Sequence, residues 1–290
     1  MPKAPQLIRT VQEMRYWRSQ RTGVVGFVPT MGALQEGHAR LLPELRPRSE
    51  TLILSIFVNP KQFGAAEDLS RYPRTFDQDM KIAQAEGVDA VFYPEPSEIY
   101  PEEYSTDVEE TMRSQGLCGL FRPGHFKGVA TIVLKLFNII QPQVALFGMK
   151  DAQQFFVIEK MVKDLNVPVV VGGHETVREP DGLAMSSRNA YLSAEERQKA
   201  PELYRILKGV QSELYDGKSI RETLGRARLA LEQTGWTVQY LDCVEVPNLQ
   251  LPSEDIVGAQ KAYLVATAAF LGKTRLIDNV ILNSDRVRLV

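Results

Sequence analysis

One segment of the chain combines residue types that suit the binding of phosphate groups. The apolar run Val24–Val28 is followed by Pro29–His38, which reads Pro-Thr-Met-Gly-Ala-Leu-Gln-Glu-Gly-His. Gly32 and Gly37 allow a ligand to approach the backbone closely, and the start of a helix offers free amide donors to an anion. A buried strand, a glycine-bearing turn and a helix start therefore predict a place where the phosphates of ATP can sit.

Other familiar kinds of site lack their sequence patterns. The triplets Gly217-Lys218-Ser219 and Gly272-Lys273-Thr274 have no upstream glycine of a phosphate-binding loop, and no Gly-x-Gly-x-x-Gly follows the first strand. No Gly-x-Ser-x-Gly elbow of an α/β-hydrolase occurs. The histidines are isolated and the cysteines far apart, which argues against a zinc site and favours two free thiols. These residues are His38, His125, His174, Cys118 and Cys243.

The composition is that of an ordinary globular protein. The 290 residues are enough for two domains, and 44% of them are apolar and 24% charged. The net charge of −2 gives no electrostatic footprint for nucleic acid or an anionic membrane. No apolar run approaches the roughly 18 residues of a transmembrane helix, and the N-terminus lacks the apolar core of a secretory signal. We therefore expect a cytoplasmic protein without nucleic-acid or membrane partners.

The first part of the chain alternates short apolar runs with helical patterns. The expected strands are Val24–Val28, Thr51–Phe57, Val88–Tyr93, Val144–Phe147 and Val167–Val171. The expected helices are Glu36–Leu45, Phe76–Glu86, Val129–Ile140 and Ala152–Asp164. This alternation predicts an α/β fold with a Rossmann-like parallel sheet and helices on both faces.

The pattern changes after about residue 190. Ser193 and Glu196 form a capping box that predicts the start of a long helix reaching about Tyr215. The later elements expected are a helix over 220–232 and strands over Val238–Val246, Ala262–Phe270 and Arg275–Leu282. Their order predicts a smaller C-terminal α+β domain with an antiparallel sheet. We place the two domains at residues 1–185 and 186–290.

Several blocks spread over nearly the whole chain carry a family resemblance. They are Phe27–Leu34, Ser55–Pro60 with Gln62-Phe63, Arg71–Arg74, Arg122–Phe126, Phe147-Gly148, Lys150-Asp151 with Gln153-Gln154, Asp181–Asn189 and Arg275–Asn279. Together, in this order, they resemble the pantothenate synthetases (pantoate–β-alanine ligases), members of the nucleotidyltransferase superfamily with a His-x-Gly-His-like motif. Any one block could arise by chance, whereas the ordered set is highly specific.

The resemblance implies two half-reactions. The carboxylate of pantoate attacks the α-phosphorus of Mg-ATP, which gives pantoyl adenylate and pyrophosphate. The amine of β-alanine then attacks the acyl carbon and releases AMP. Neither step needs a protein nucleophile, so catalysis rests on positioning and on charge stabilisation at phosphate oxygens. The resemblance further implies ATP as a substrate, Mg²⁺, a homodimer, a first domain that binds nucleotide and pantoate, and a second domain that acts as a lid.

By the resemblance, the catalytic residues are His38, Lys150 and Arg188. His38 donates to the phosphates as pyrophosphate leaves, and Lys150 neutralises phosphate charge. Arg188 closes on the phosphates from a loop that also carries Ser186 and Ser187. The residues expected at ATP are Met31, Gly32, Ala33, Leu34, Gln35, Glu36, Gly37, His38, Gly148, Met149, Lys150, Asp151, Val177, Met185, Ser186, Ser187 and Arg188.

The resemblance assigns pantoate to Gln62 and Gln154, and assigns β-alanine to Gln62 as well. Neutral amides orient hydroxyls and a carboxylate without quenching the nucleophile. Val177 is expected to contact the adenine ring through its backbone. Asp79 and Asp151 are expected to support magnesium only indirectly, so no direct protein ligand to the metal is predicted.

The first residue of the motif departs from the family pattern. Gln35 stands in place of a histidine three residues before His38, so both side chains face the same way on a helix. Compared with a histidine, the Gln35 amide keeps a donor and loses a possible positive charge. This loss weakens the stabilisation of the transition state by about 1–2 kcal/mol, which lowers the rate about 5- to 30-fold. We therefore expect weakened rather than abolished activity. Other positions also depart from the family pattern. Lys61 stands where an apolar residue usually precedes Gln62, and Ala152 replaces an aromatic residue. Cys118 and Met149 each replace a Glu, and Gly173-His174-Glu175 replaces a Gly-Val-Pro segment.

Three interpretations stay open. The chain is an active pantothenate synthetase, a paralogue that binds nucleotide or pantoate with little turnover, or an adenylate-forming enzyme for another carboxylic acid. The retention of His38, Lys150, Gln62, Gln154 and the Ser-Ser-Arg loop favours the first, because a non-catalytic binder does not need them all.

Overall fold

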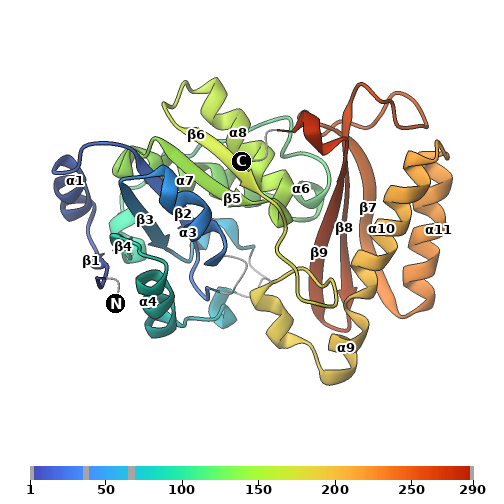
Figure 1. Cartoon of the computed structure of the whole chain (residues 1–290), viewed down its shortest axis with the longest axis horizontal. Coiled ribbons are helices and arrows are strands. Elements are labelled where there is room, and N and C mark those ends of the chain that lie inside the picture. The colour runs from blue at the N-terminus through green and yellow to red at the C-terminus, as the bar shows by residue number, and fades with distance from the viewer. Residues whose placement is uncertain (1–2, 35–38, 65–68, 288–290) are drawn as a thin grey trace. The chain divides into compact units, whose positions relative to one another are not determined.

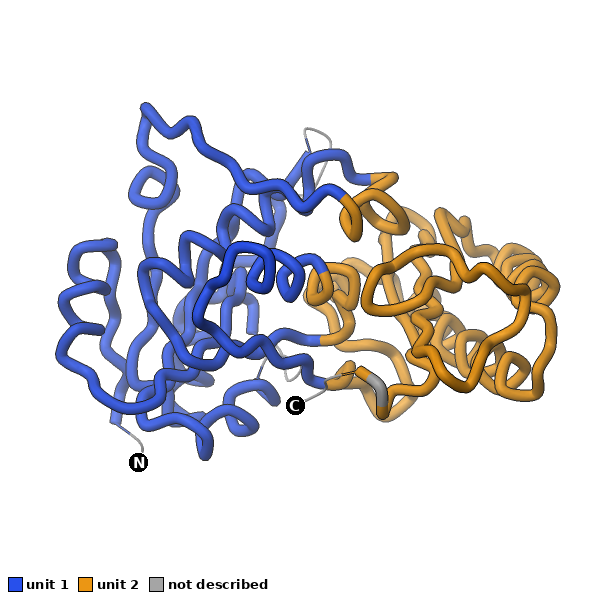
Figure 2. The backbone as a smooth tube through the Cα atoms, turned by 90° about the horizontal axis from the view of Figure 1, so that it is seen from above, with its two compact units in different colours: residues 1–111, 122–148, 157–174 blue, residues 112–121, 149–156, 175–290 orange. Residues whose placement is uncertain are grey.

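The computed structural model describes residues 3–34, 39–64 and 69–287. The chain forms two compact units, which Figure 2 colours separately. Unit 1 covers residues 1–111, 122–148 and 157–174, and unit 2 covers residues 112–121, 149–156 and 175–290. The last passage from unit 1 to unit 2 lies between His174 and Glu175. Compactness alone does not define a functional domain, so the predicted boundary at residue 186 stays a prediction.

Within the described residues, unit 1 is built on a six-stranded parallel sheet (Figure 1). The strands are β1 (Gln6–Ile8), β2 (Val25–Thr30), β3 (Thr51–Ile56), β4 (Ala90–Phe92), β5 (Val144–Gly148) and β6 (Val170–His174), in the order β1-β4-β3-β2-β5-β6. Its helices are α1 (Val11–Ser19), α3 (Leu41–Leu45), α4 (Phe76–Ala85), α5 (Pro96–Ile99) and α7 (His125–Ile140), with 3₁₀ helices η1 (Arg46–Arg48), η2 (Pro60–Gln62) and η3 (Leu69–Arg71). Helix α8 (Ala152–Asp164) begins in unit 2 and ends in unit 1.

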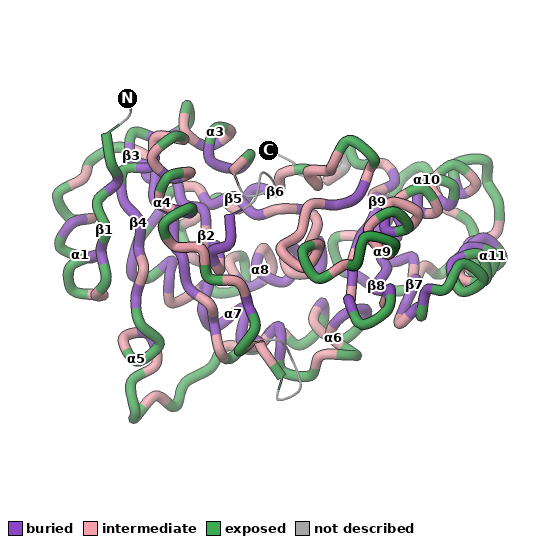
Figure 3. The backbone as a smooth tube through the Cα atoms, turned by 90° about the horizontal axis from the view of Figure 1, so that it is seen from below, coloured by how far each residue is buried: buried purple, intermediate pink, exposed green. Residues whose placement is uncertain are grey.

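Helices cover both faces of this sheet. On one face, Val28 of β2 shares a hydrophobic core with Leu45 of α3 and Ala83 of α4. On the other face, Phe27 meets Phe137 of α7 edge-on, with ring centroids 6.3 Å apart. Because Phe27 and Val28 are consecutive in β2, their side chains point to opposite faces. Figure 3 accordingly shows β2, β3 and β5 largely buried. The prediction of a Rossmann-like parallel sheet is confirmed.

Unit 2 carries a three-stranded antiparallel sheet with helices packed against it (Figure 1). Its strands are β7 (Trp236–Val246), β8 (Ala262–Leu271) and β9 (Thr274–Leu282), in that order. Its helices are α6 (Cys118–Phe121), α9 (Ala194–Lys199), α10 (Glu202–Tyr215) and α11 (Ile220–Gln233), with 3₁₀ helices η4 (Met149–Asp151), η5 (Ser187–Tyr191) and η6 (Ser284–Arg286). Leu207 of α10 and Leu231 of α11 share a core with Val265 of β8. The predicted α+β architecture is confirmed.

The single long helix expected after Ser193 is two helices in the structure. The capping box forms as predicted, because Ser193 Oγ accepts from the Glu196 amide at 3.2 Å and Glu196 Oε2 accepts from the Ser193 amide at 2.8 Å. Nevertheless α9 ends at Lys199 and α10 begins at Glu202. Pro201 explains the break, since proline has no amide proton and its ring clashes with the preceding turn inside a helix.

Candidate functional site

The strand order of the parallel sheet reverses beside β2. The chain passes from β2 to β3 and β4 on one side, and then to β5 and β6 on the other. In open parallel sheets, ligands bind outside the carboxyl ends of the strands at such a reversal. The residues that follow these ends are Met31 after β2 and Met149 after β5. Both belong to segments that the family resemblance places at ATP.

The turn after β2 has a conformation that requires glycine. Gly32 has a φ of +79°, and a Cβ there would lie 2.9 Å from Ile56 Cγ2 and 3.0 Å from Asp79 Oδ2. Its amide donates to Thr30 Oγ1 at 3.2 Å. The packing of the turn against its own unit therefore requires a glycine at this position, whatever ligand approaches it.

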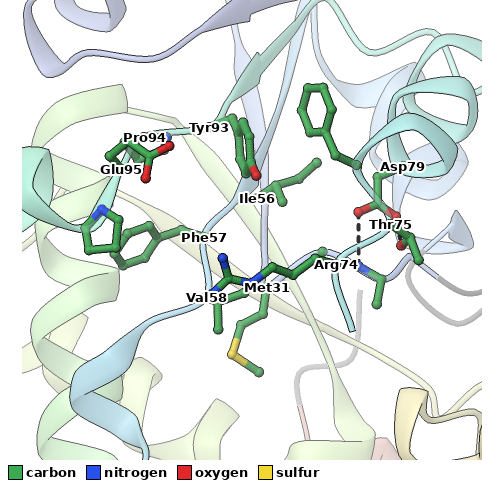
Figure 4. A pocket seen from close by; sticks show the side chains of 14 residues that line it. Met31, Ile56, Phe57, Val58, Arg74, Thr75, Asp79, Tyr93, Pro94 and Glu95 are labelled. Atoms are coloured by element: carbon green, nitrogen blue, oxygen red, sulfur yellow. Dashed lines mark hydrogen bonds between the residues drawn. The ribbon is translucent and has the colours of Figure 1, made fainter. Parts of the chain in front are cut away.

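Asp79 of α4 anchors this turn (Figure 4). Its Oδ2 accepts from the Ala33 amide at 3.0 Å. Its Oδ1 accepts from the Leu34 amide at 2.8 Å. The Thr75 hydroxyl also donates to Oδ1, at 3.1 Å. Asp79 is only 1% exposed, and burial raises its pKa while the hydrogen bonds from Leu34, Thr75 and Ala33 oppose that rise. Its oxygens are committed to the turn.

A small pocket lies beside the turn, along the carboxyl ends of β3 and β4 (Figure 4). Its volume is about 60 Å³. Phe57, Val58 and Tyr93 contribute to its lining, and the exposed residues Arg74 and Glu95 add one charge of each sign. The pocket therefore combines apolar contact with ionic groups, but its volume is well below the roughly 300–1,000 Å³ of common small-molecule sites.

Gln62, which is predicted at pantoate, is the last residue of η2 and is only 8% exposed. Its Oε1 accepts from Asn59 Nδ2 at 3.2 Å, and its Nε2 donates to Met31 Sδ at 2.9 Å. Asn59 also donates to the Gly128 carbonyl oxygen at 3.0 Å and accepts from the Tyr100 hydroxyl at 2.8 Å. Both ends of the Gln62 amide are therefore held beside the turn that follows β2.

The start of α7 holds the main chain of Gln62. His125 Nδ1 donates to the Gln62 carbonyl oxygen at 2.8 Å, and Arg122 Nη2 donates to the same oxygen at 3.3 Å. Gly128 comes so close to η2 that a Cβ there would lie 2.3 Å from the Lys61 carbonyl oxygen. Arg122 and His125 belong to a family block in which no role is predicted for them, and the structure shows that they support η2.

In unit 2, the predicted catalytic Lys150 lies in η4. Its Nζ is 3.7 Å from Asp151 Oδ2. Asn279 Nδ2 donates to the carbonyl oxygen of Met149 at 2.8 Å and to that of Lys150 at 3.0 Å. Asn279, which ends one of the family blocks, thus fixes the main chain that carries Lys150.

A partly buried ion pair supports the hairpin that leads to the predicted phosphate-binding loop. Arg178 donates to both carboxylate oxygens of Asp278, at 2.7 and 2.9 Å. Asp278 is 3% exposed, and burial raises its pKa although Arg178 opposes the rise. The Met185 amide donates to the Val177 carbonyl oxygen at 3.0 Å, so two residues predicted at ATP are neighbours in this hairpin.

The loop that follows is fixed by short-range hydrogen bonds. Ser186 caps η5, and its Oγ accepts from the Arg188 amide at 3.3 Å. Asn189 Nδ2 donates to the Ala184 carbonyl oxygen at 3.1 Å. The main chain of the Ser-Ser-Arg segment therefore has a defined conformation.

Gln154, the second residue predicted at pantoate, lies half-buried in the first turn of α8. Its neighbour Gln153 has a structural role, because its Oε1 accepts from the Cys118 amide at 2.9 Å. Gln153 Nε2 also donates to the carbonyl oxygens of Gly116 at 2.8 Å and Arg113 at 2.9 Å. Consecutive helical residues point in different directions. Gln153 is therefore used to hold neighbouring main chain, while Gln154 points in a different direction. The prediction that Gln154 binds pantoate is compatible with this arrangement.

The predicted site residues are distributed over both units. Gln35, Glu36, Gly37 and His38 lie outside the described residues. Unit 1 carries Met31, Gly32, Ala33, Leu34, Gln62 and Gly148, and unit 2 carries Met149, Lys150, Asp151, Gln154, Val177, Met185, Ser186, Ser187 and Arg188. Among the described residues, no group of three or more His, Cys, Asp or Glu side chains could hold a metal ion. In the same part of the chain, no helix has both the length and the apolar character needed to cross a membrane.

Comparison with known proteins gives matches over almost the whole chain. A model of the Pantoate-beta-alanine ligase family matches residues 6–281. A pantothenate synthetase from Chromobacterium violaceum is 50% identical over 277 residues, which cover 95% of this chain and 98% of the relative. The crystal structure of a pantothenate synthetase from Thermus thermophilus superposes with a TM-score of 0.88 at 44% identity, covering 95% of this chain and 98% of that one. A pantoate–β-alanine ligase from Francisella tularensis, crystallised with Beta-gamma ATP and β-alanine, gives a TM-score of 0.81 at 32% identity and covers 96% and 97%.

Proposed function

The chain belongs to the pantoate–β-alanine ligase family, and on that basis we propose that it joins pantoate to β-alanine with ATP, releasing AMP and pyrophosphate. The family match over residues 6–281 carries this proposal, because it spans every residue predicted at ATP, pantoate and β-alanine. The strand order supports it as well, since the reversal beside β2 predicts a ligand crevice where the segment Met31–Leu34 begins.

Two transfers make up the proposed reaction. A carboxylate oxygen of pantoate forms a bond to the α-phosphorus of ATP while the bond from that phosphorus to pyrophosphate breaks. The amine of β-alanine then bonds to the acyl carbon and loses a proton, and AMP leaves. The protein has to hold the reacting groups in line and to neutralise the charge on phosphate oxygens.

Side chains with N–H donors serve the first transfer. We assign His38, Lys150 and Arg188 to the phosphate oxygens of ATP. Two contacts support the assignment, because Asn279 fixes the main chain at Lys150 and Ser186 caps the Arg188 amide. Donors that are held in advance stabilise developing charge without reorganisation during the reaction.

Amide side chains serve pantoate. We assign Gln62 and Gln154 to this substrate, and Gln62 also to β-alanine. The contacts of the Gln62 amide with Asn59 and Met31 support its role, because they fix the direction in which it can hydrogen-bond. A neutral amide binds the carboxylate without withdrawing the charge that makes it a nucleophile.

Magnesium fits this arrangement as an ion that enters with ATP. Mg²⁺ prefers oxygen ligands, keeps several waters and takes one or two carboxylates besides phosphate oxygens. Asp151, whose side chain is 46% exposed, can accept hydrogen bonds from such waters, whereas the three hydrogen bonds that Asp79 accepts hold the turn after β2. We infer that ATP supplies most of the ligands and Asp151 helps to hold the hydrated ion, whose charge would offset that of the phosphates.

We also infer a homodimer and a cytoplasmic location, both from the family resemblance and the sequence. The mass of one chain is 32.6 kDa. Size-exclusion chromatography with light scattering tests the dimer, which would give twice that mass.

The test of the activity is AMP formation by the purified protein. We expect AMP only when ATP, pantoate and β-alanine are all present. Absence of AMP at high protein concentration would contradict the proposal and favour a paralogue that binds without turnover. Exchange of ATP with pyrophosphate in the presence of other carboxylic acids, but not pantoate, would identify an adenylate-forming enzyme for a different acid.

A further inference from the structure

Lys61 brings a charge to the position before Gln62, where the family usually has an apolar residue. Its Nζ lies 2.7 Å from Asp107 Oδ1 and 4.3 Å from the centroid of the Tyr104 ring. The side chains of Lys61 and Asp107 are 34% and 29% exposed, so the pair is partly shielded from water. An ion pair and a cation–π contact thus connect η2 with the segment that follows α5.

Two further cations belong to this cluster. Lys135 Nζ lies 4.4 Å from the centroid of the same Tyr104 ring, and Lys127 Nζ lies 4.0 Å from Asp107 Oδ2. Burial and the charge of Lys61 lower the pKa of Lys135, while the hydrogen bond from Lys61 lowers the pKa of Asp107. The ammonium groups repel one another, and the carboxylate of Asp107, which pairs with Lys61 and Lys127, offsets this repulsion among the described residues.

The cluster is connected to Gln62 in two ways. Along the main chain, Lys61 directly precedes Gln62 in η2. Through side chains, Tyr104 meets Tyr100 edge-on, with ring centroids 5.0 Å apart. The Tyr100 hydroxyl donates to Asn59 Oδ1, and Asn59 Nδ2 donates to Gln62 Oε1. Movement of the cluster would therefore shift both the backbone and the amide of Gln62.

We propose that Lys61 is a positioning residue for Gln62, and that its ion pair with Asp107 is a latch that holds η2 in place. The inference rests on the proposed function only in taking pantoate as the ligand of Gln62. An apolar residue at position 61 would pack on the Tyr104 ring but could not bind Asp107. In this chain, the ion pair between Lys61 and Asp107 holds η2 in place of such apolar packing.

Four variants test the latch by steady-state kinetics. Asp107→Asn removes the carboxylate and leaves the ammonium groups unbalanced, whereas Lys61→Met removes one ammonium and Lys61→Arg keeps the pair. Lys127→Met is the matched control. It also removes a positive charge beside the Asp107 carboxylate, but Lys127 belongs to α7 and not to η2. We expect the KM for pantoate to rise about three- to tenfold in Asp107→Asn and about two- to fivefold in Lys61→Met. In Lys61→Arg and Lys127→Met we expect the KM for pantoate to stay within about twofold of the wild type. In all four variants we expect little change in kcat and in the KM for ATP.

A second measurement does not depend on activity. The amides of Gln62 and Phe63 donate within η2, to the carbonyl oxygens of Asn59 and Pro60. In Asp107→Asn we expect these two amides to exchange hydrogen about three- to tenfold faster, with a fall of no more than about 4 °C in the midpoint of global thermal unfolding.

The outcomes separate the latch from the proposed function. An unchanged KM for pantoate in Asp107→Asn overturns the positioning role, even if exchange becomes faster. An equal rise in Lys127→Met also overturns it, because charge alone would then explain the effect. If the wild-type protein forms no AMP from pantoate and β-alanine, the proposed function fails, and hydrogen exchange then decides on the latch. Unchanged exchange at Gln62 and Phe63 in Asp107→Asn overturns the latch in that case.

Discussion

His125 donates a hydrogen bond from Nδ1 to the carbonyl oxygen of Gln62, 2.8 Å away. Its other ring nitrogen, Nε2, lies 3.2 Å from Nη1 of Arg122, a group that can only donate. Nε2 therefore accepts, and the imidazole is the neutral tautomer with its proton on Nδ1. Arg122 thus helps to hold the His125 ring in the orientation in which Nδ1 faces η2.

Removal of this donor is expected to weaken pantoate binding. His125→Leu leaves the Gln62 carbonyl oxygen with one donor fewer, and a hydrogen bond is worth about 0.5–1.5 kcal/mol, so we expect the KM for pantoate to rise about three- to tenfold. His125→Asn is the matched control, because its amide can place a donor near the position of Nδ1. Kinetics with pantoate varied at saturating ATP and β-alanine measure the effect. Equal KM values for His125→Leu and the wild type would contradict the expectation.

The close approach of α7 to η2 leads to a prediction about Gly128. A Cβ at this position would lie 2.3 Å from the Lys61 carbonyl oxygen, so Gly128→Ala forces the backbone apart. We expect a loss of about 1–3 kcal/mol in the free energy of unfolding, together with a higher KM for pantoate. Gly209→Ala in α10 is the control, because a Cβ there meets nothing within 4 Å and alanine is expected to stabilise the helix by about 0.5–1 kcal/mol. Urea unfolding distinguishes them, and similar effects of the two substitutions would contradict this account.

The sequence is most informative where periodicity and capping decide the structure. Apolar runs locate β2 and β3 within about two residues, because a strand buried on both faces needs a continuous apolar run. Helix α1 is absent from the sequence expectations, although Thr10 and Glu13 form a capping box that could have indicated it. The break at Pro201 could equally have been read from the sequence, since proline rarely occupies a helix interior.

The sequence is least informative where a side chain supports a main chain far away along the chain. Asn279 binds the carbonyl oxygens of Met149 and Lys150, and His125 binds that of Gln62. Such contacts leave no periodic pattern, because they depend on how distant segments pack. Motif recognition found these residues, but only the structure shows what each of them holds.

Asp79→Asn is expected to disrupt the turn after β2. Asparagine has one acceptor oxygen, and its NH₂ group would face the amide of Ala33 or Leu34, so one buried amide loses its partner. An unsatisfied buried amide costs about 1–3 kcal/mol. We expect kcat/KM for ATP to fall about ten- to a hundredfold, as measured by AMP formation with ATP varied. A value within twofold of the wild type would contradict the anchoring role.

The same substitution has a defined effect on the pH dependence of stability. Burial raises the pKa of Asp79 above its ordinary value of 3.8. The stability contributed by this group is therefore fully present below the pKa of the unfolded chain and is lost as pH rises through the higher folded pKa. As pH rises above the ordinary pKa of 3.8, we expect the wild type to lose stability relative to Asp79→Asn in urea unfolding. A difference between the two proteins that is constant with pH would contradict the raised pKa.

His38 and Gln35 lie outside the described residues, so their predicted roles rest on the family resemblance. Because His38 is assigned to the phosphates as pyrophosphate leaves, we expect His38→Ala to lower the rate of the first transfer far more than Gln35→Ala does. Release of pyrophosphate in a single turnover, with pantoate present and β-alanine absent, measures that transfer alone. Equal losses in the two variants would contradict the division of roles.

Gln35→His is expected to act in the opposite direction. A hydrogen bond from a charged donor is worth about 1.5–3 kcal/mol and one from a neutral amide about 0.5–1.5 kcal/mol, so a histidine at this position gains about 1–2 kcal/mol when protonated. We expect the single-turnover rate to rise several-fold, with most of the gain at lower pH, where the imidazole carries its charge. Gln35→Asn keeps an amide and serves as the control, for which we expect no gain. An unchanged or lower rate in Gln35→His would show that the chain is adapted to the amide. The next variant would then combine Gln35→His with Met149→Glu, because Met149 is another departure from the family pattern.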